Sequence, residues 1–304
     1  MFGVYAGPGA KGVEGAKAFA KYFGAPIIRR RDFLPYDRWD QVATGDWVLK
    51  AHEAETLDLD LAIPLMTWEG LAGGETLRDV ANGNRDVEYS RLAKAIATTN
   101  HTDITVSLGW EFNGNWYPWK TTTETAQDFI DAYRRVWSLF VGDHNMDHVK
   151  FIWCVSNGAL SSFPNPLLAW PGNRYVDLLG VDFYDYHWSY ARSGTSKTQR
   201  DKAFTQLVVD DFGLYHWMDI AKEEGKPLVL PEWGAAIKAD HTGGGDNPDF
   251  VNRVISLIEQ QKILWGNYFE AGNESVDHRI ATNDSKLPSS RGAFRSRMSA
   301  LNGV

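Results

Sequence analysis

The sequence has very little cysteine. Cys154 is the only one among 304 residues, so neither an intramolecular disulfide nor a cysteine-built metal site can form. Its position inside an apolar run predicts an inert core thiol. The eight histidines show neither His-Glu-x-x-His nor His-x-His spacing, which gives a zinc site little support. We therefore expect no metal ion and no other cofactor.

Long apolar runs and surplus positive charge are absent as well. No run approaches the roughly 20 apolar residues of a membrane span, so we expect no membrane partner. Lys and Arg number 31 against 39 Asp and Glu, a net charge of −8. An acidic surface argues against binding to a nucleic-acid backbone, which requires a basic patch. We expect a monomer.

The N-terminus shows no export signal. Met1 is followed directly by a strand-like segment, without a basic region or an apolar leader. The sequence leaves localisation open: we expect an extracellular protein if a signal has been removed, and a cytoplasmic one otherwise.

Aromatic residues, in contrast, are abundant. The chain contains 13 Trp, 12 Tyr and 15 Phe. Part of this set is expected in the core. So many tryptophans also indicate a groove for flat, amphipathic ligands such as sugars.

Short apolar runs recur along the chain. They are rich in β-branched or aromatic residues, as buried parallel strands are. Eight runs are expected to form strands: Phe2–Tyr5, Pro26–Arg30, Leu61–Trp68, Ile104–Glu111, Val149–Ser156, Val176–Tyr184, Pro227–Gly234 and Ile263–Glu270.

Helical patterns lie between these runs. Ala10–Phe23, Glu124–Val141 and Asp249–Gln260 each repeat apolar residues at helical spacing. Strands alternating with helices predict an α/β fold, a single (β/α)8 TIM barrel over residues 1–304. A doubly wound open sheet is the main alternative. It usually has a glycine-rich phosphate loop after its first strand, and Gly7-Pro8-Gly9 is a poor match.

Two expected strands end on a glutamate. Glu111 closes the fourth strand and Glu232 lies near the end of the seventh, each beside tryptophan. In a barrel, both would face the C-terminal mouth, where the chemistry of this fold occurs. Two opposed carboxyl groups are what glycoside hydrolysis requires: one protonates the leaving oxygen, and the other attacks the sugar. The alternative is that each glutamate pairs with an arginine or caps a loop.

The segment around Glu111 is distinctive. Trp110–Trp119 resembles the acid/base segment of glycoside hydrolase family 26, which contains the β-mannanases. Tyr175–Tyr184 and Leu230–Gly234 resemble the family's sixth and seventh strands. The resemblance implies a retaining, endo-acting enzyme on a β-linked polysaccharide such as β-mannan. It assigns Glu111 as acid/base and Glu232 as nucleophile.

The chain departs from the family pattern at two positions. Trp110 replaces the histidine that usually precedes the acid/base, and Ser107 replaces a frequent arginine. The resemblance places both positions at or under the subsite for the reacting sugar. We therefore expect weak activity on plain β-1,4-mannan and a preference for a different or decorated β-glycan.

Further residues are candidates for the sugar-binding cleft. We expect substrate contacts from Trp68, Trp110, Asn113, Trp116, Trp119, Tyr184, Trp233 and Trp265. Core packing is the alternative for Trp265 and Tyr184, and packing on a helix for Trp116 and Trp119. Tyr184 could also donate a hydrogen bond to Glu232. Asp182 is expected to orient an Arg or Tyr.

The arginines at positions 29–31 and Asp32 are placed at the end of the second strand. They could form an anion site. The preferred interpretation is that one Arg points inward to a carboxylate, the others are solvated, and Asp32 touches a sugar hydroxyl.

Three other interpretations remain open. Acidic residues around Gly243–Gly245 could form a calcium loop, although they lack EF-hand spacing. A metal-dependent barrel lyase or isomerase would need several acidic ligands on adjacent strand ends. A non-catalytic carbohydrate-binding barrel would keep the aromatic groove without turnover.

Overall fold

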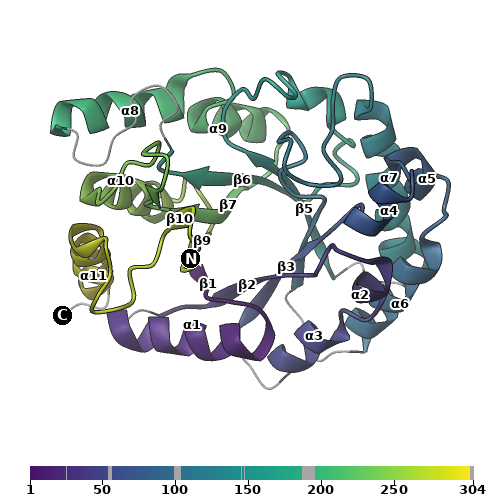
Figure 1. The fold of residues 1–304 in the computed structure, drawn as a ribbon, viewed down its shortest axis with the longest axis horizontal. Coiled ribbons are helices and arrows are strands. Elements are labelled where there is room, and N and C mark those ends of the chain that lie inside the picture. The colour runs from purple at the N-terminus through teal and green to yellow at the C-terminus, as the bar shows by residue number, and fades with distance from the viewer. Residues whose placement is uncertain are drawn as a thin grey trace.

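Eight parallel strands close into a barrel in the order β1-β2-β3-β4-β5-β6-β7-β9, as the computed structural model shows (Figure 1). The structure describes residues 1–24, 26–53, 57–98, 104–144, 146, 148–186 and 196–301. The barrel strands are β1 Phe2–Tyr5, β2 Arg29–Phe33, β3 Asp58–Ile63, β4 Ile104–Leu108, β5 Lys150–Ser156, β6 Leu178–Tyr184, β7 Leu228–Gly234 and β9 Gly266–Phe269. The expected TIM barrel is confirmed.

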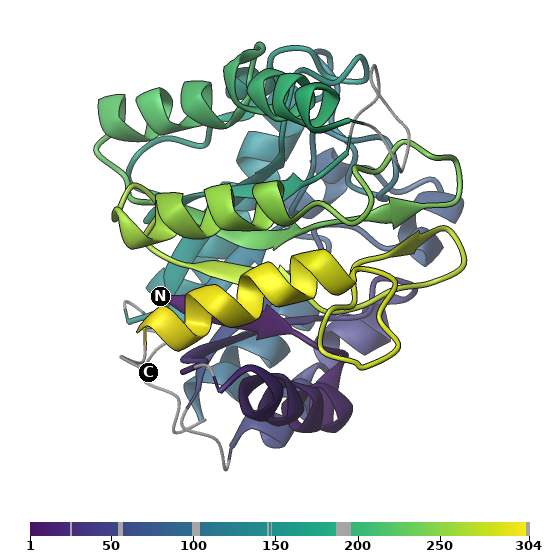
Figure 2. The ribbon, with the colours of Figure 1, turned by 90° about the vertical axis from the view of Figure 1, so that its left-hand side faces the viewer.

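Helices surround the barrel, and Figure 2 shows α11 and α10 running along its outside. They are α1 Gly9–Phe23, α2 Trp39–Ala43, α3 Asp46–His52, α4 Trp68–Ala72, α5 Leu77–Ala81, α6 Asp86–Ala97, α7 Ala126–Ser138, α8 Lys197–Val209, α9 Leu214–Glu223, α10 Pro248–Glu259 and α11 Pro288–Leu301. A π-helical turn, Leu139–Asp143, continues α7, and Pro166–Ala169 is a 3₁₀ turn. No helix in the described part of the chain is long and apolar enough to cross a membrane.

Helix α10 illustrates how the sequence specifies a helix against the barrel. Asn247 caps it by accepting a hydrogen bond from the Phe250 amide at 3.3 Å, and Pro248 occupies the first turn, where its missing N–H costs nothing. Val251, Val254 and the other apolar residues of one face are buried. The outward faces of the strands and such helical faces form the core.

A small antiparallel pair lies beside the barrel mouth. Strand β8 (Ile237–Lys238), which follows β7, pairs with β10 (Val276–Asp277), which follows β9. This pair places residues of two distant loops side by side at the C-terminal ends of the strands.

Only the first strand has the expected bounds. The largest differences are in four strands: the second is Arg29–Phe33 instead of Pro26–Arg30, the third is Asp58–Ile63 instead of Leu61–Trp68, the fourth ends at Leu108 instead of Glu111, and the eighth begins at Gly266 instead of Ile263. In the second and third strands, charged residues lie inside the strand. Because the interior of this barrel is polar, apolar runs in the sequence do not coincide with these two strands.

Candidate active site

A cavity of about 1190 Å³ opens at the C-terminal ends of the strands. Glu111 and Glu232 both line it. Its other described lining residues come from the segments after β4, β5, β6, β7 and β9 and from the α8–α9 region, and none follows β1, β2 or β3. The two glutamates therefore share one cavity, as expected for the mouth of a barrel.

The backbone turns sharply where it leaves β4. Gly109 has φ 56° and Glu111 has φ 50°, a left-handed conformation that is uncommon for a residue with a side chain. The Gly109 amide donates to the Ile63 carbonyl at 2.8 Å, and the Glu111 amide donates to the Cys154 carbonyl at 3.0 Å. Hydrogen bonds to both neighbouring strands thus hold Glu111 in a strained conformation, a frequent feature of functional sites.

Glu111 is nearly buried, with 8% of its surface exposed. Burial, followed by the nearby charge of Glu232, raises its pKa from 4.5 to about 8. The Trp116 indole N–H donates to Glu111 Oε2 at 2.8 Å and opposes that rise. Glu111 therefore keeps its proton near neutral pH and can act as a general acid.

Glu232 has a different environment. Arg31 Nη2 lies 3.2 Å from Oε1, and the Tyr184 hydroxyl donates to Oε2 at 2.6 Å. A guanidinium has only donors, so this arrangement suits an ionised carboxylate. The expected hydrogen bond from Tyr184 is present, and Tyr184 also lines the cavity.

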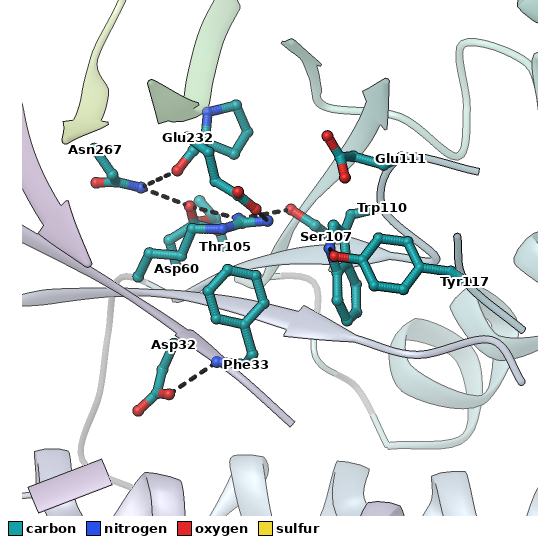
Figure 3. A network of polar contacts seen from close by, with 12 residues as sticks. Asp32, Phe33, Asp60, Thr105, Ser107, Trp110, Glu111, Tyr117, Glu232 and Asn267 are labelled. Atoms are coloured by element: carbon teal, nitrogen blue, oxygen red, sulfur yellow. Dashed lines mark hydrogen bonds and ion pairs between the residues drawn. The ribbon is translucent and has the colours of Figure 1, made fainter. Parts of the chain in front are cut away.

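Arg31 is the centre of a polar network inside the barrel; its partners Asp60, Ser107 and Glu232 are labelled in Figure 3. It is fully buried, and its Nη1 donates to Asp60 at 3.0 Å and to Ser107 at 3.3 Å. Asp60 also accepts from Asn267 at 2.8 Å and from Thr105 at 3.2 Å. These residues come from β2, β3, β4 and β9, so most of the barrel takes part in holding Glu232.

The prediction for the three arginines of β2 is confirmed for one residue and wrong for the other two. Arg31 is the one that points inward to a carboxylate. Arg29 and Arg30 are buried too, not solvated: Arg29 pairs with Asp58 at 2.9 Å, and Arg30 pairs with Asp32 at 2.7 Å. None of the three forms an open anion site.

Asp32 does not reach the cavity. It is fully buried, and its carboxylate accepts from the Gly9 amide at 2.8 Å as well as from Arg30. Side chains alternate along a strand, so Asp32 points outward to α1 while Arg31 points inward. The expectation that Asp32 touches sugar is wrong.

Asp182 lines the cavity and is 1% exposed. Its carboxyl oxygens accept no hydrogen bond from an Arg or Tyr of the described chain, so the expected orienting role is not seen. Burial, followed by the charge of Glu232, raises the pKa of Asp182 well above its usual range. Burial therefore favours the neutral form of the Asp182 carboxyl group.

Two tryptophans of the loop after β4 are in the core rather than in the cleft. Trp110 and Trp119 are fully buried, and their rings lie 4.5 Å apart. The Trp119 indole donates to the Trp110 carbonyl at 2.7 Å. Neither residue lines the cavity. The expected substrate contact is therefore wrong for both residues, whereas Trp116 is 41% exposed and does line the cavity.

Trp233 and Trp265 are also core residues. Trp233 is fully buried and packs against Tyr268 with ring centroids 5.0 Å apart. Trp265 precedes β9 at the opposite end of the barrel, under the Arg29 guanidinium at 4.6 Å. Alternation along β7 turns Trp233 away from the cavity, and Trp265 lies at the far end of the barrel, so neither residue lines the cavity.

Asn113 and Trp68 do not line the cavity either. Asn113 is buried; it accepts from the Ser156 amide at 2.9 Å and donates to the Ser156 carbonyl at 2.8 Å. It therefore fixes the loop after β4 to the end of β5. Trp68 is 43% exposed at the start of α4 and remains a candidate for contact with substrate outside the cavity.

The cavity contains residues that the sequence did not single out. Among them are Tyr117, Tyr186, Lys238, Phe269 and His278. Burial lowers the pKa of His278 to about 4, so its ring is neutral near pH 7. The only available signal was position: each of these residues lies at the end of a barrel strand or on a segment that follows one.

The glycine loop after β8 shows no cluster of metal-ligating side chains. No group of three or more His, Cys, Asp or Glu residues in the described ranges is arranged to hold a metal ion. Asp246 instead accepts hydrogen bonds from the amides of Ser289 and Ser290, at 2.8 and 2.7 Å, at the start of α11.

Sequence comparison relates the chain to enzymes that act on polysaccharides. Residues 83–222 match the model of Glycosyl hydrolase family 26. Endoglucanase H of Acetivibrio thermocellus is 23% identical over 240 residues, 77% of this chain and 24% of that protein. A mannan endo-1,4-β-mannosidase of Bifidobacterium adolescentis is 27% identical over 175 residues, 54% of this chain and 16% of that protein. The chain thus spans less than half of these relatives.

Solved structures share the fold. A modular endo-β-1,4-mannanase from Cellulomonas fimi aligns with a TM-score of 0.65 and 16% identity, over 92% of this chain and 64% of that one. Bacillus subtilis mannanase aligns with a TM-score of 0.61 and 12% identity, over 96% and 83%. The sequence match, the barrel and the strand-four segment together confirm that this chain is related to glycosyl hydrolase family 26.

Proposed function

We propose that the protein is a retaining glycoside hydrolase that cleaves within a β-linked polysaccharide. In this proposal, Glu111 protonates the leaving oxygen while Glu232 attacks the anomeric carbon, forming a covalent glycosyl-enzyme. Glu111 then deprotonates the water that releases the sugar. The observation that carries the proposal is the different environments of two carboxyl groups in one cavity.

The environments match the two roles. Glu111 is buried without a cationic hydrogen-bond partner. Its raised pKa keeps the carboxyl group protonated, so Glu111 can supply the proton. Glu232 accepts from Arg31 and Tyr184, which also orient it for attack. Retention further requires the two carboxyl groups to lie about 5–5.5 Å apart.

The relatives suggest the substrate class. Their names point to mannan in one case and, for endoglucanase H, to glucan. We therefore propose β-mannan or a related, decorated β-glycan. The cavity is large enough for several sugar rings, which supports endo action.

A polysaccharide screen tests the activity. Mannans, xylans, mixed-linkage glucans and bacterial exopolysaccharides should be incubated with the protein and the products analysed. We expect short oligosaccharides whose newly formed reducing end is first seen by NMR as the β-anomer. An α-anomer would contradict retention, and binding without hydrolysis would favour a carbohydrate-binding barrel.

Substitution of the glutamates tests their roles. Glu232→Ala should abolish turnover of every substrate, because no covalent intermediate can form. Glu111→Ala should retain the first step on dinitrophenyl glycosides, because this leaving group needs no proton. Burst kinetics on activated and unactivated substrates measure the difference. Equal losses of Glu111→Ala on both substrates would contradict its assignment as the acid.

A further inference from the structure

Trp110 and Tyr117 form a hydrogen-bonded pair at the edge of the cavity. The Trp110 indole nitrogen lies 3.0 Å from the Tyr117 hydroxyl oxygen, and the two rings are 5.0 Å apart (Figure 3). An indole N–H can only donate a hydrogen bond. The Tyr117 oxygen is therefore the acceptor, and its own proton must point elsewhere.

No other described residue takes this proton. Within the described chain, the Tyr117 hydroxyl makes one hydrogen bond, in which it accepts from the Trp110 indole. Tyr117 lines the same cavity as Glu111 and Glu232. Burial and the charges of these two glutamates raise its pKa well above its usual value. The phenol thus keeps its proton and offers it to the cavity.

Aromatic neighbours hold the Tyr117 ring in place. Trp119 stacks on it at 4.5 Å with an interplanar angle of 11°, and Tyr36 meets it edge-on at 5.5 Å. Trp110 itself is fully buried and cannot turn away without leaving a buried donor unpaired, which is costly. Ring position and hydrogen-bond direction are therefore both fixed before a ligand arrives.

We propose that Tyr117 is a specificity residue of the reacting subsite, where it donates a hydrogen bond to one hydroxyl oxygen of the bound sugar. Trp110 is its positioning residue, because the indole makes the phenol an obligatory donor. The inference rests on the proposed function. It deepens that function, since it gives a role to the replacement of histidine by Trp110.

The test combines enzyme and substrate changes in one cycle. The substrates are 2,4-dinitrophenyl β-mannobioside and β-cellobioside, together with analogues lacking a single hydroxyl on the reacting sugar. Tyr117→Phe should lower kcat/KM about tenfold on the faster parent glycoside, as loss of one hydrogen bond does. For one deoxy analogue the same substitution should have no effect, because the partner hydroxyl is already missing.

Two further variants separate recognition from packing. Tyr36→Phe removes a hydroxyl from the same aromatic cluster, at a position that does not line the cavity. It should change kcat/KM by the same factor on every analogue. Trp110→Phe keeps a ring but removes the N–H, so Tyr117 can turn its proton away. This variant should weaken the dependence of kcat/KM on that one sugar hydroxyl.

The outcomes are distinct. If the wild type hydrolyses neither parent glycoside nor any glycan of the polysaccharide screen, the proposed function fails and this inference fails with it. If it hydrolyses only another glycan of the screen, the dinitrophenyl glycoside of that glycan and its deoxy analogues replace the parents in the cycle. If the wild type is active but Tyr117→Phe has equal effects on all analogues, the inference alone is overturned. Thermal melting identifies misfolded variants, and in that case Trp110→Phe decides: substrate discrimination identical to the wild type would also overturn the inference.

Discussion

The carboxyl group of Glu111 is subject to opposing influences. Burial and the charge of Glu232 raise its pKa to about 8, and the hydrogen bond from Trp116 lowers it. A general acid must be protonated in the free enzyme, so kcat/KM should fall as the pH rises through about 8. The alkaline side of the pH profile therefore reports on Glu111.

Substitution of Trp116 should move this part of the profile. Trp116→Phe removes the N–H that favours the charged carboxylate, so the alkaline limb of kcat/KM should shift to higher pH. The measurement is kcat/KM against pH on an unactivated substrate. Trp47→Phe, an exposed tryptophan on α3, is the control and should leave the limb in place. A shift to lower pH with Trp116→Phe would disprove the assignment.

Arg31 supplies from β2 the guanidinium that the family resemblance places at position 107 on β4. Its Nη1 touches Ser107 at 3.3 Å, so the two positions share one space in the barrel. Arg31→Ser should lose several kcal/mol of stability and most activity, because it leaves two buried carboxylates without their cation.

Relocation of the arginine tests this equivalence. The double variant Arg31→Ser, Ser107→Arg returns a guanidinium to Glu232 from the neighbouring strand. We expect it to recover part of the free energy of unfolding and of kcat/KM that Arg31→Ser loses, measured by urea unfolding and kinetics. Arg31→Ser with Ser107→Lys is the control for charge alone. A double variant no better than Arg31→Ser would refute the idea.

At the scale of elements, the end of β4 combines a left-handed turn with close packing. A Cβ at Gly109 would lie 2.7 Å from Leu65 Cδ1 and 3.2 Å from Phe129 Cε2. Both contacts are with core side chains, so this position requires glycine for space as well as for its φ. The turn sets where Glu111 enters the cavity.

Two glycine substitutions separate these causes. Gly225 has φ 66°, and a Cβ added there would meet no atom within 4 Å, so Gly225→Ala should cost only about 1–2 kcal/mol of backbone strain. Gly109→Ala adds overpacking of roughly 1–3 kcal/mol and should also lower activity. Urea unfolding measures both. Equal losses would show that steric contact at position 109 contributes nothing.

The sequence was sufficient for the pattern of elements and for the residues at strand ends. The order of the eight barrel strands and the candidates Glu111 and Glu232 follow from apolar periodicity and position, and the bond from Tyr184 follows from the family resemblance. Packing could not be predicted in the same way. Whether a tryptophan faces a cavity or a helix depends on strand register and on loops that fold back, as Trp119 and Trp233 show. The polar interior around Asp60 was missed because a charged residue in a strand resembles a strand end.

At the scale of the whole molecule, the cavity is asymmetric. Its described lining comes from the β4–β7 and β9 side. At the edge of this lining, the rings of Phe33, Tyr36 and Trp110 pack against one another and against the cavity-lining Tyr117. Trp110 itself does not line the cavity. Compared with the histidine of the family pattern, Trp110 removes a polar side chain from this wall.

This wall leads to a prediction about substrate choice. A site binds a sugar selectively when it offers a hydrogen-bond partner to a hydroxyl that only this sugar carries. Without that partner, the site loses its preference for the sugar. We expect plain β-1,4-mannan to be a weak substrate compared with another or a decorated β-glycan. Comparative kcat/KM values on a glycan panel decide this. Plain mannan as the best substrate by a wide margin would refute the argument from Trp110.

The network around Arg31 also links catalysis to the order of folding. Asp60 on β3 meets Asn267 only when β9, the last barrel strand, is in place, and Arg31 meets Glu232 only when β7 has joined. Until then, water must remain around these charges, since burying them unpaired is costly. We expect the barrel interior to lose its water and the barrel to close in a single late step of folding. The orientation of Glu232 would then be completed only when β9 has joined the barrel.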